Sequence, residues 1–246
     1  MESPIIYYDP TSEPCRAVHW FCLELNIPFE LKYVWLTRNE HLSQGFLKVN
    51  PFHQVPAMKC QGFCLSEATA IMQYLADAND CRSTWFGRGI EESALISQSL
   101  SWYHTNLRKV LTLDYFLPVL LMPAYLGAPK PPAAEVSQRG EALHAMLGQL
   151  DSVLANAPFL AGATISASDI LFASDLAALE IDPDRREILA SFTNIENWLA
   201  TLQAMTNYQK SHSVWNRVAP QIMKAVNEPM GSGPEWVAEA CEQLTS

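Results

Sequence analysis

Ser12 stands where a predicted strand passes into a predicted helix. The apolar run 4–8 stops at Asp9, the turn formers Pro10-Thr11 follow, and a helical pattern begins near Pro14. Open α/β sheets bind ligands at the carboxyl ends of their strands, and a helix N-terminus carries partial positive charge. A hydroxyl here could therefore donate to an anion, or it could be an ordinary N-cap with no other duty. No Gly-x-Ser-x-Gly motif surrounds it, which argues against a hydrolase nucleophile.

Val55-Pro56 opens another predicted strand, although a proline cannot donate to a sheet ladder. A cis peptide bond here would turn the Val55 backbone outward, where it could pair with an extended, peptide-like ligand. Only about 5–6% of X-Pro bonds in folded proteins are cis, so the residues alone favour the trans form.

Ser66-Glu67-Ala68 opens the next predicted helix. Its free amides and positive dipole end suit a carboxylate ligand, and the Glu67 carboxylate could accept from a ligand ammonium. The alternative is that Ser66 caps the helix and Glu67 is a first-turn acid. Between these segments, His41 and Gln54 are either further ligand contacts or simply solvated. A small peptide with an α-amino acid end and a thiolate would use all of these groups together.

Short strands and helices must bring these residues together. Apolar and β-forming patterns predict strands over 4–8, 29–35, 55–60 and 63–65, and helical spacing predicts helices over about 14–25 and 41–49 and from residue 66. A strand–helix–strand start needs a parallel pair whereas the final hairpin is antiparallel, so a small mixed sheet is predicted.

Beyond Cys81 the pattern becomes helical, with Gly87-Arg88-Gly89 as a linker. The predicted helices cover about 91–120, 136–156, 167–179, 195–205 and 210–226. Ser166 and Asp169 fit a capping box at the start of the third of them. After a glycine hinge at 231–233, a short helix containing Trp236 is predicted.

Composition narrows the class of protein. The 246 residues carry a net charge of −10 without a basic cluster, which argues against nucleic acid and an anionic membrane surface as partners. No apolar run approaches a membrane span and the N-terminus does not look like a signal peptide, so a cytoplasmic protein is expected.

The six cysteines form no Cys-x-x-Cys pair and the six histidines show no ligand spacing, so no metal site is expected. Cys60 should face Phe63 across a hairpin, so no disulfide with Cys64 is expected.

Four stretches of the chain resemble the glutathione transferases, and the theta class in particular. "SEPCRAVHWFCLELNIPFE" is similar to the N-terminal theta motif, and "FLKVNPFHQVPAMKCQGFCLSEATAIMQYL" resembles the following stretch of that family. "LSWYHTNLRKV" and "FLAGATISASDI" resemble segments of its second domain. The likeness covers most of residues 5–180 in order and weakens after Leu189. It implies an α/β thioredoxin-like domain with a four-stranded mixed sheet over 1–80, and an all-helical domain over 90–246 that carries the site for an electrophile.

The resemblance also assigns roles to residues. It implies that Ser12 is the catalytic hydroxyl that stabilises the thiolate of the co-substrate glutathione, with Cys15 as a rival nucleophile that is better explained as buried packing. The implied glutathione contacts are His41, Leu42, Gln54, Val55, a cis Pro56, Glu67 and Ala68. Two positions depart from the family, because Ala68 replaces a usual serine and Gln54 replaces a common lysine. Each lost contact to a charged group costs on the order of 1.5–3 kcal/mol unless replaced, so glutathione affinity should be modest.

The expected function is therefore that of a serine-type glutathione S-transferase in detoxification, which conjugates glutathione to small hydrophobic electrophiles. Dehalogenase, peroxidase and lyase activities would use the same thiolate. The electrophile-site candidates are Tyr8, Arg108, Leu111, Tyr115 and Trp236, together with Trp102 if it is not core. The alternative is a non-catalytic ligand-binding or assembly protein of the same fold, whereas a glutaredoxin-like oxidoreductase is disfavoured by serine in place of cysteine.

Two further expectations concern assembly and the tail. The resemblance implies a homodimer, with Phe52 near the subunit interface. Gly231–Leu244 is expected either to act as a lid on the second substrate or to dock far from the site.

Overall fold

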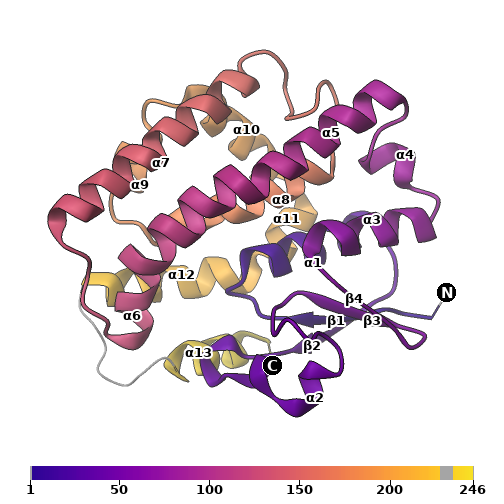
Figure 1. The fold of residues 1–246 in the computed structure, drawn as a ribbon, viewed down its shortest axis with the longest axis horizontal. Helices are drawn as coiled ribbons and strands as arrows, with labels where there is room; N and C mark the ends of the chain where they lie inside the picture. Colours follow the sequence, from indigo (N-terminus) through magenta and orange to yellow (C-terminus); the bar gives the residue numbers. More distant parts are fainter. Residues whose placement is uncertain (1, 228–234, 246) are drawn as a thin grey trace.

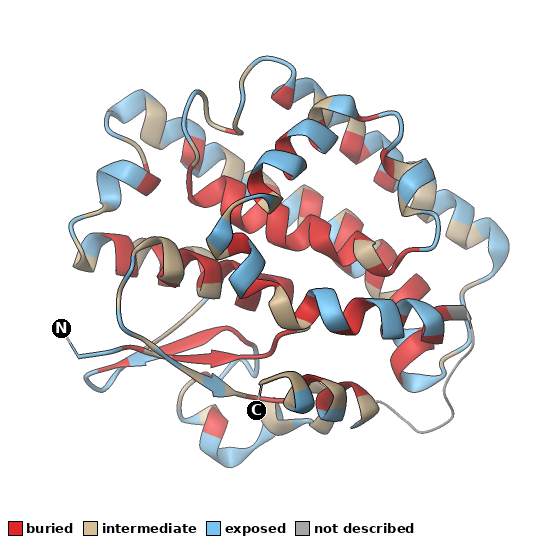
Figure 2. Cartoon of the chain, turned by 180° about the vertical axis from the view of Figure 1, so that it is seen from behind, coloured by how far each residue is buried: buried red, intermediate tan, exposed pale blue. Residues whose placement is uncertain are grey.

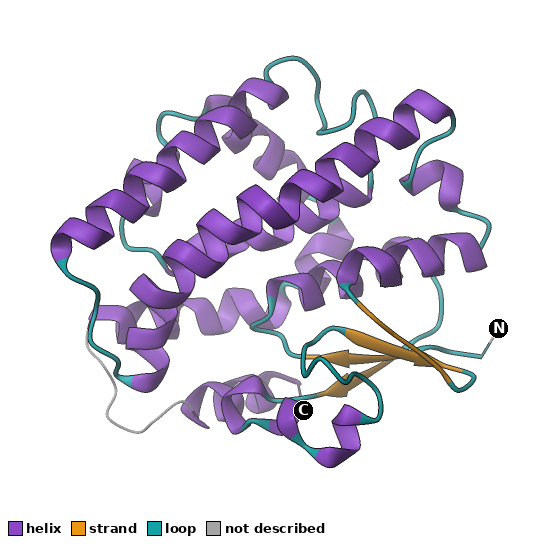
Figure 3. Ribbon diagram, in the orientation of Figure 1, coloured by secondary structure: helices purple, strands orange, loops and turns teal. Residues whose placement is uncertain are grey.

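A four-stranded mixed sheet forms the N-terminal part of the computed structural model, which describes residues 2–227 and 235–245. Its strands are β1 (Ile5–Tyr8), β2 (Glu30–Tyr33), β3 (Ala57–Cys60) and β4 (Phe63–Ser66), in the spatial order β2-β1-β3-β4 (Figure 3). β1 runs parallel to β2 and antiparallel to β3, and β3 pairs antiparallel with β4. The predicted mixed sheet is confirmed, and its arrangement is thioredoxin-like. Cys60 pairs with Phe63, and Cys60 and Cys64 are both free thiols.

Helices cover both faces of this sheet because alternate strand residues point to opposite sides. α1 (Glu13–Glu24) and α3 (Ala68–Ala78) lie over one face (Figure 1), where Ile6 and Met58 join the main core. The short α2 (Gln44–Leu47) lies below the sheet, and its Phe46 ring packs edge-on against Tyr7 at 5.7 Å between centroids. The chain passes from the carboxyl end of β1 through residues 9–12 into the start of α1.

The rest of the described chain is mostly helical. Its elements are α4 (Arg82–Trp85), α5 (Ile90–Trp102), η3 (Tyr103–Leu121), α6 (Met122–Leu126), α7 (Ala133–Leu154), α8 (Ala167–Leu176), η4 (Ala177–Ile181), α9 (Arg185–Leu189), α10 (Thr193–Gln203), α11 (Thr206–Ser211), α12 (Ser213–Asn227) and α13 (Glu235–Thr245). Every residue of α8 is buried, and Figure 2 shows buried segments running through the middle of this helical layer. α1 packs against α8 and α11, which joins the sheet to the helices.

The run Ile90–Leu126 is one long helical rod made of α5, η3 and α6. By length and composition alone it could cross a membrane, but half of its apolar stretch is buried inside the fold. That burial is what a core helix of a globular bundle shows. Its middle segment, η3, has π-type hydrogen bonds and is therefore wound more widely than an α-helix.

Most predicted elements are present, and the differences are local. The short helix predicted over 41–49 is present as α2 but covers only Gln44–Leu47, and two 3₁₀ turns, η1 (Leu36–Arg38) and η2 (Glu40–Leu42), precede it. The predicted helix 210–226 is interrupted at His212, between α11 and α12, and the short helices α4 and α9 lie in segments predicted to be connections. The capping box at Ser166 and Asp169 is confirmed, as is a helix containing Trp236. The glycine hinge at 231–233 lies outside the described residues.

Candidate active site

A cleft of about 480 Å³ opens between the carboxyl end of β1 and the rod segment η3. Eight of the predicted site residues line it together: Ser12, His41, Gln54, Val55, Pro56, Glu67, Ala68 and Arg108. These residues come from five separate segments of the chain, so the fold has brought them to one place. The cleft also has walls that the sequence did not indicate, described below.

Ser12 is the N-cap residue of α1, yet within the described chain its side chain makes no capping hydrogen bond. Both of its backbone groups are used, because Ser12 N donates to Asp9 O and Ser12 O accepts from Arg16 N, each at 3.1 Å. The side chain lines the cleft at the positive end of a 12-residue helix. The ordinary-cap alternative therefore lacks its defining hydrogen bond.

Cys15, the rival nucleophile, is completely buried one helical turn away. Burial raises the pKa of the Cys15 thiol to about 12, and its hydrogen bond with the Ser12 side chain offsets this only in part. Because the thiolate is the reactive form, Cys15 is inert packing at neutral pH. A hydroxyl has two acceptor sites and one proton, so Ser12 can accept from this thiol and still donate to a ligand.

The strand and helix starts that flank the cleft have unusual backbones. The Val55–Pro56 bond is cis, as the family resemblance implied and contrary to the trans form that the residues alone favoured. Glu67 has φ 71° and ψ 118°, a conformation that costs a non-glycine residue about 1–3 kcal/mol. Such strain is concentrated at functional sites, and here it turns the chain from β4 into α3 directly at the cleft.

Glu67, not Ser66, is the N-cap residue of α3, so the predicted serine cap is wrong. The pairing of β3 with β4 continues as far as Ala57 and Ser66, which holds Ser66 in an extended strand. The helix can begin only after the chain has turned at Glu67. Ala68, the first residue of α3, then lines the cleft.

Three histidines, His41, His53 and His104, border the cleft. Burial lowers the pKa of His41, the neighbouring His53 lowers it further, and the Asp9 carboxylate opposes the shift. The buried Asn50 side chain shapes the loop that carries His53 and Gln54, because its Nδ2 donates to Gln54 O at 2.7 Å. Within residues 2–227 and 235–245, no group of three or more His, Cys, Asp or Glu could hold a metal ion.

The opposite wall of the cleft is one face of η3. Its lining residues recur every four to five positions: Tyr103 and His104, Arg108, Thr112 and Leu113, Phe116 and Leu117, and Leu121. An α-helix repeats every 3.6 residues, so such a stripe would drift around its surface, whereas π-type winding keeps it on one side. The sequence did not indicate the apolar half of this stripe, from Leu113 to Leu121, because an α-helical period does not bring these residues to one side.

The same winding explains two electrophile-site predictions that the structure does not place in the cleft. Leu111 and Tyr115 lie three and seven residues after Arg108, which is one face of an α-helix. In η3 they turn away from the cleft. Leu111 is completely buried in the core, and Tyr115 Oη donates to Asp182 Oδ2 at 2.8 Å.

Other predicted contacts also lie outside the cleft lining. Tyr8 is buried within the sheet, between the rings of His19 and Tyr33. Trp236 packs edge-on against Tyr125, and Leu42 is half exposed on η2 without lining the cleft. Trp102 stacks on Phe172, so it belongs to the core side of the bundle.

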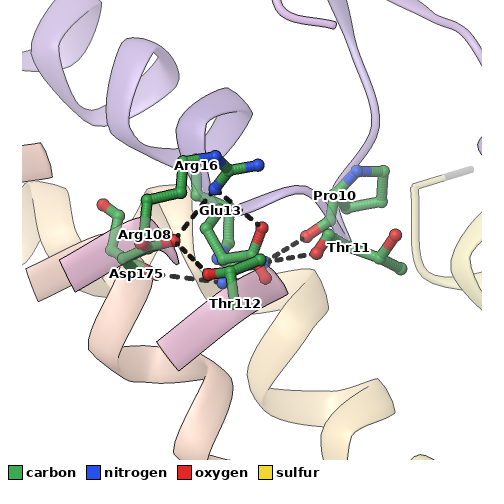
Figure 4. A network of polar contacts seen from close by, with 8 residues as sticks. Pro10, Thr11, Glu13, Arg16, Arg108, Thr112 and Asp175 are labelled. Carbon is green, nitrogen blue, oxygen red and sulfur yellow. Dashed lines mark hydrogen bonds and ion pairs between the residues drawn. The ribbon is translucent and has the colours of Figure 1, made fainter. Parts of the chain in front are cut away.

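Arg108 is held on the cleft wall by two carboxylates. Its Nη1 lies 3.2 Å from Asp175 Oδ1 and 3.7 Å from Glu13 Oε2, while Thr112 Oγ1 also donates to Asp175 at 3.2 Å (Figure 4). Burial lowers the pKa of Arg108, but Asp175, Tyr103 and Glu13 together outweigh it, so the net shift is upward. Burial raises the pKa of Asp175, and Arg108 offsets this in part. Arg108 is therefore a fixed cation whose charge is largely compensated within the protein.

Comparison with known proteins identifies the family of this fold and cleft. The family described as "Glutathione S-transferase, N-terminal domain" matches residues 11–78. The chain is 36% identical over 172 residues to human glutathione S-transferase theta-1 and 35% identical over 179 residues to the mouse protein, in each case over 70% of this chain and 71% of the relative. The solved structure of human glutathione S-transferase T1-1 in its apo form superposes with a TM-score of 0.80 at 28% identity, over 97% of this chain and 100% of that one. The chain therefore belongs to the glutathione transferase family and is related to its theta class.

Proposed function

We propose that this protein is a serine-type transferase that activates the glutathione thiol as a thiolate and conjugates it to small hydrophobic electrophiles. The observation that carries the proposal is Ser12, whose hydroxyl lines the cleft at a helix N-terminus without capping that helix. The hydroxyl proton is then available to a sulfur anion in the cleft. Cys15 does not compete, because its thiol is buried and protonated.

The Ser12 hydroxyl and the N-terminus of α1 can together lower the pKa of the glutathione thiol far enough to form a thiolate near neutral pH. An ordinary thiol has a pKa of about 8.5, and lowering it by about two units needs roughly 2.7 kcal/mol of preference for the anion. A hydrogen bond to a charged group contributes about 1.5–3 kcal/mol, and a helix N-terminus adds about 0.3–1 kcal/mol. One hydroxyl and the start of α1 together supply what is needed.

The remaining polar groups of the cleft suit the rest of glutathione. In our proposal the Val55 backbone pairs with the cysteinyl unit, while the Glu67 carboxylate and the Ala68 amide bind the α-amino acid end of the γ-glutamyl unit. His41 and Gln54 face the glycyl carboxylate. Ala68 has no hydroxyl and Gln54 no charge, so we expect a modest affinity for glutathione.

The electrophile would lie against the apolar face of η3. Leu113, Phe116, Leu117 and Leu121 share this face, and they replace Leu111 and Tyr115 in our proposal. Arg108 and Thr112 form the polar boundary between this face and Ser12. Because Arg108 is already compensated by Asp175 and Glu13, an uncharged electrophile fits this wall without leaving a buried charge unpaired.

The homodimer and the cytoplasmic location stay predictions. Phe52 is 70% exposed on the loop before β3, which is consistent with a role in covering a second copy. Glutathione is proposed as co-substrate without a metal.

Thiolate absorbance of bound glutathione against pH, followed by a panel of electrophiles, tests the proposal. Wild type should bind glutathione with a thiol pKa well below that of the free peptide and should turn over at least one alkyl halide, epoxide, peroxide or aryl ether. Ser12→Ala should raise the bound thiol pKa by about one unit or more. Ser43→Ala is a matched control, because Ser43 does cap its helix through Phe46 N at 3.3 Å and should leave the thiol pKa unchanged. Binding without turnover of any electrophile would favour the non-catalytic alternative, and superimposable titrations for wild type and Ser12→Ala would refute the role of the serine.

A further inference from the structure

Arg16 is a buried cation whose side chain binds backbone carbonyls of the loop between β1 and α1. Its side chain is completely buried one turn into α1, and among the described residues no carboxylate forms an ion pair with it. Instead Nη1 donates to Pro10 O and Thr11 O, both at 3.0 Å (Figure 4), and the guanidinium lies 4.4 Å above the Trp215 ring. Burying a guanidinium without a carboxylate is costly, so the carbonyls that solvate it are strongly held in turn.

Asp9 holds the same loop from its other side. This aspartate is also buried, and its Oδ1 accepts from Thr11 N at 2.8 Å and from Thr11 Oγ1 at 2.7 Å. Its Oδ2 accepts from Leu36 N at 2.9 Å, and its backbone carbonyl accepts from Ser12 N at 3.1 Å. The carbonyls of the loop thus point to a buried cation and its amides to a buried aspartate.

These contacts leave Ser12 with one group for the cleft. Its amide is bound to Asp9 and its carbonyl to the Arg16 amide, so the side-chain hydroxyl, which also contacts the Cys15 thiol, is the group of Ser12 that can offer a proton to the cleft. The backbone of Ser12 is ordinary, with φ −81° and ψ 122°, so local geometry does not by itself fix where the hydroxyl points. The peptide units before it set the position and direction of its Cα–Cβ bond, and two of their carbonyls are bound to Arg16.

We propose that Arg16 is a positioning residue for Ser12: by binding the carbonyls of Pro10 and Thr11 it fixes the direction of the hydroxyl that meets the glutathione thiolate. This inference rests on the proposed function of Ser12. The competing explanation is purely structural, because Nη2 of Arg16 also donates to Ser174 O at 3.1 Å and so ties α1 to α8. A structural tie would affect unfolding but not the pKa of a bound thiol.

A double-mutant cycle between Arg16 and Ser12 separates these cases. Arg16→Met keeps most of the side-chain volume and removes the donors. It should raise the pKa of bound glutathione by about one unit, which lowers kcat/KM about tenfold at about pH 5.5, where the thiol is mostly protonated. In the Ser12→Ala background, the same substitution should cause no further shift, because the hydroxyl it positions is absent. Glutathione affinity at that pH should change less than about threefold.

Two more variants make the result decisive. Arg16→Lys keeps a buried cation but loses the forked guanidinium that reaches both carbonyls. It should fold and raise the pKa of bound glutathione by less than Arg16→Met does. If Arg16→Met does not fold, Arg16→Lys replaces it in the cycle. Trp20→Phe is the stability control. Trp20 is equally buried on α1, but its Nε1 donates to Glu24 Oε1 at 2.7 Å and its ring packs edge-on against Tyr208, so the substitution should leave the thiol pKa unchanged.

The other outcomes overturn the inference in distinguishable ways. A full shift that persists in the Ser12→Ala background would show that Arg16 acts through its charge and not through the serine. No shift for either Arg16 variant, with Ser12→Ala shifted as expected, would refute the positioning role and leave the proposed function intact. No shift for Ser12→Ala itself would refute both.

Discussion

Two leucines on η3 should respond to the same substitution in opposite ways. Leu117 lies on the cleft face and is partly exposed, whereas Leu111 lies on the other face and is completely buried. Leu117→Ala should therefore weaken binding of the electrophile and cost clearly less stability than Leu111→Ala, because Leu117 is only partly buried against the core. Leu111→Ala should destabilise the fold and leave electrophile binding unchanged.

The magnitudes follow from what each side chain touches. Truncating leucine to alanine removes three carbons, and each buried methylene contributes about 0.8 kcal/mol. An electrophile covers part of the Leu117 side chain, so the loss should be about 1–2 kcal/mol, or roughly a 5- to 30-fold rise in KM with kcat little changed. For Leu111 the lost transfer energy and the cavity together should cost about 2–5 kcal/mol of unfolding free energy.

Initial rates at saturating glutathione, with the best electrophile of the panel, give KM and kcat for both variants. Urea unfolding gives the stabilities. Each variant serves as the control for the other, because the residue type, the substitution and the helix are the same. If Leu111→Ala raised KM while Leu117→Ala cost more stability than Leu111→Ala, η3 would present an α-helical face to the cleft and our assignment of its lining would be wrong.

Four further outcomes are expected. Asp169→Ala should cost at least about 3 kcal/mol in urea unfolding, because its buried carboxylate accepts four hydrogen bonds; a loss below about 1 kcal/mol would contradict this. Burial lowers the pKa of His212, so the free energy of unfolding should fall as pH drops below about 6.5. Between pH 7.5 and 5, the stability of His212→Phe should rise by up to about 2 kcal/mol relative to that of wild type. Parallel pH profiles of stability for the two proteins would refute this role of His212. Sedimentation at micromolar concentration should show a dimer that Phe52→Ser weakens, whereas a lone 27.5 kDa species in wild type would exclude it. Deleting residues 235–245 should change electrophile KM more than glutathione affinity if the tail is a lid, and unchanged kinetics would count against one.

The tail prediction needs this test because α13 lies beside the cleft without lining it. Its Glu242 forms a bidentate ion pair with Arg38 at 2.5 and 2.9 Å, which docks the helix on η1. Leu36, at the start of η1, does line the cleft. The tail could therefore act on the cleft through η1 as well as by covering it.

Much of the fold could be predicted because its signals are local. Strand ends could be predicted to within two residues, since runs of β-forming residues end at prolines, glycines or turn formers. Pro14 marked the first turn of α1, and Ser166 with Asp169 marked α8. The short helices α4 and α9 were missed because four or five residues are too few to display a period.

The candidate site could be predicted only in part, for a different reason. Ser12, Val55 and Glu67 stand at the ends of elements, where spacing along the chain already indicates a ligand. Leu117 and His53 carry no such mark, because their positions depend on helix winding and on loop conformation. Leu111 would share the face of Arg108 in a helix of 3.6 residues per turn, but the structure shows a wider helix there.

The backbone at Glu67 departs from ordinary geometry against the preference of that residue type. Positive φ at Asn26, Asn39, His53 and Asp80 occurs at residue types that tolerate it, and Gln61 lies in the turn between β3 and β4. Glu67 (φ 71°, ψ 118°) lies on the cleft and belongs to neither case. The β3–β4 ladder holds the chain before Glu67 in place. Regular helices and strands satisfy their own amides and carbonyls, so a surface that must offer such groups to a ligand has to interrupt them. At Glu67 the residue's own preference is overridden because the β3–β4 ladder sets where the chain can turn into α3.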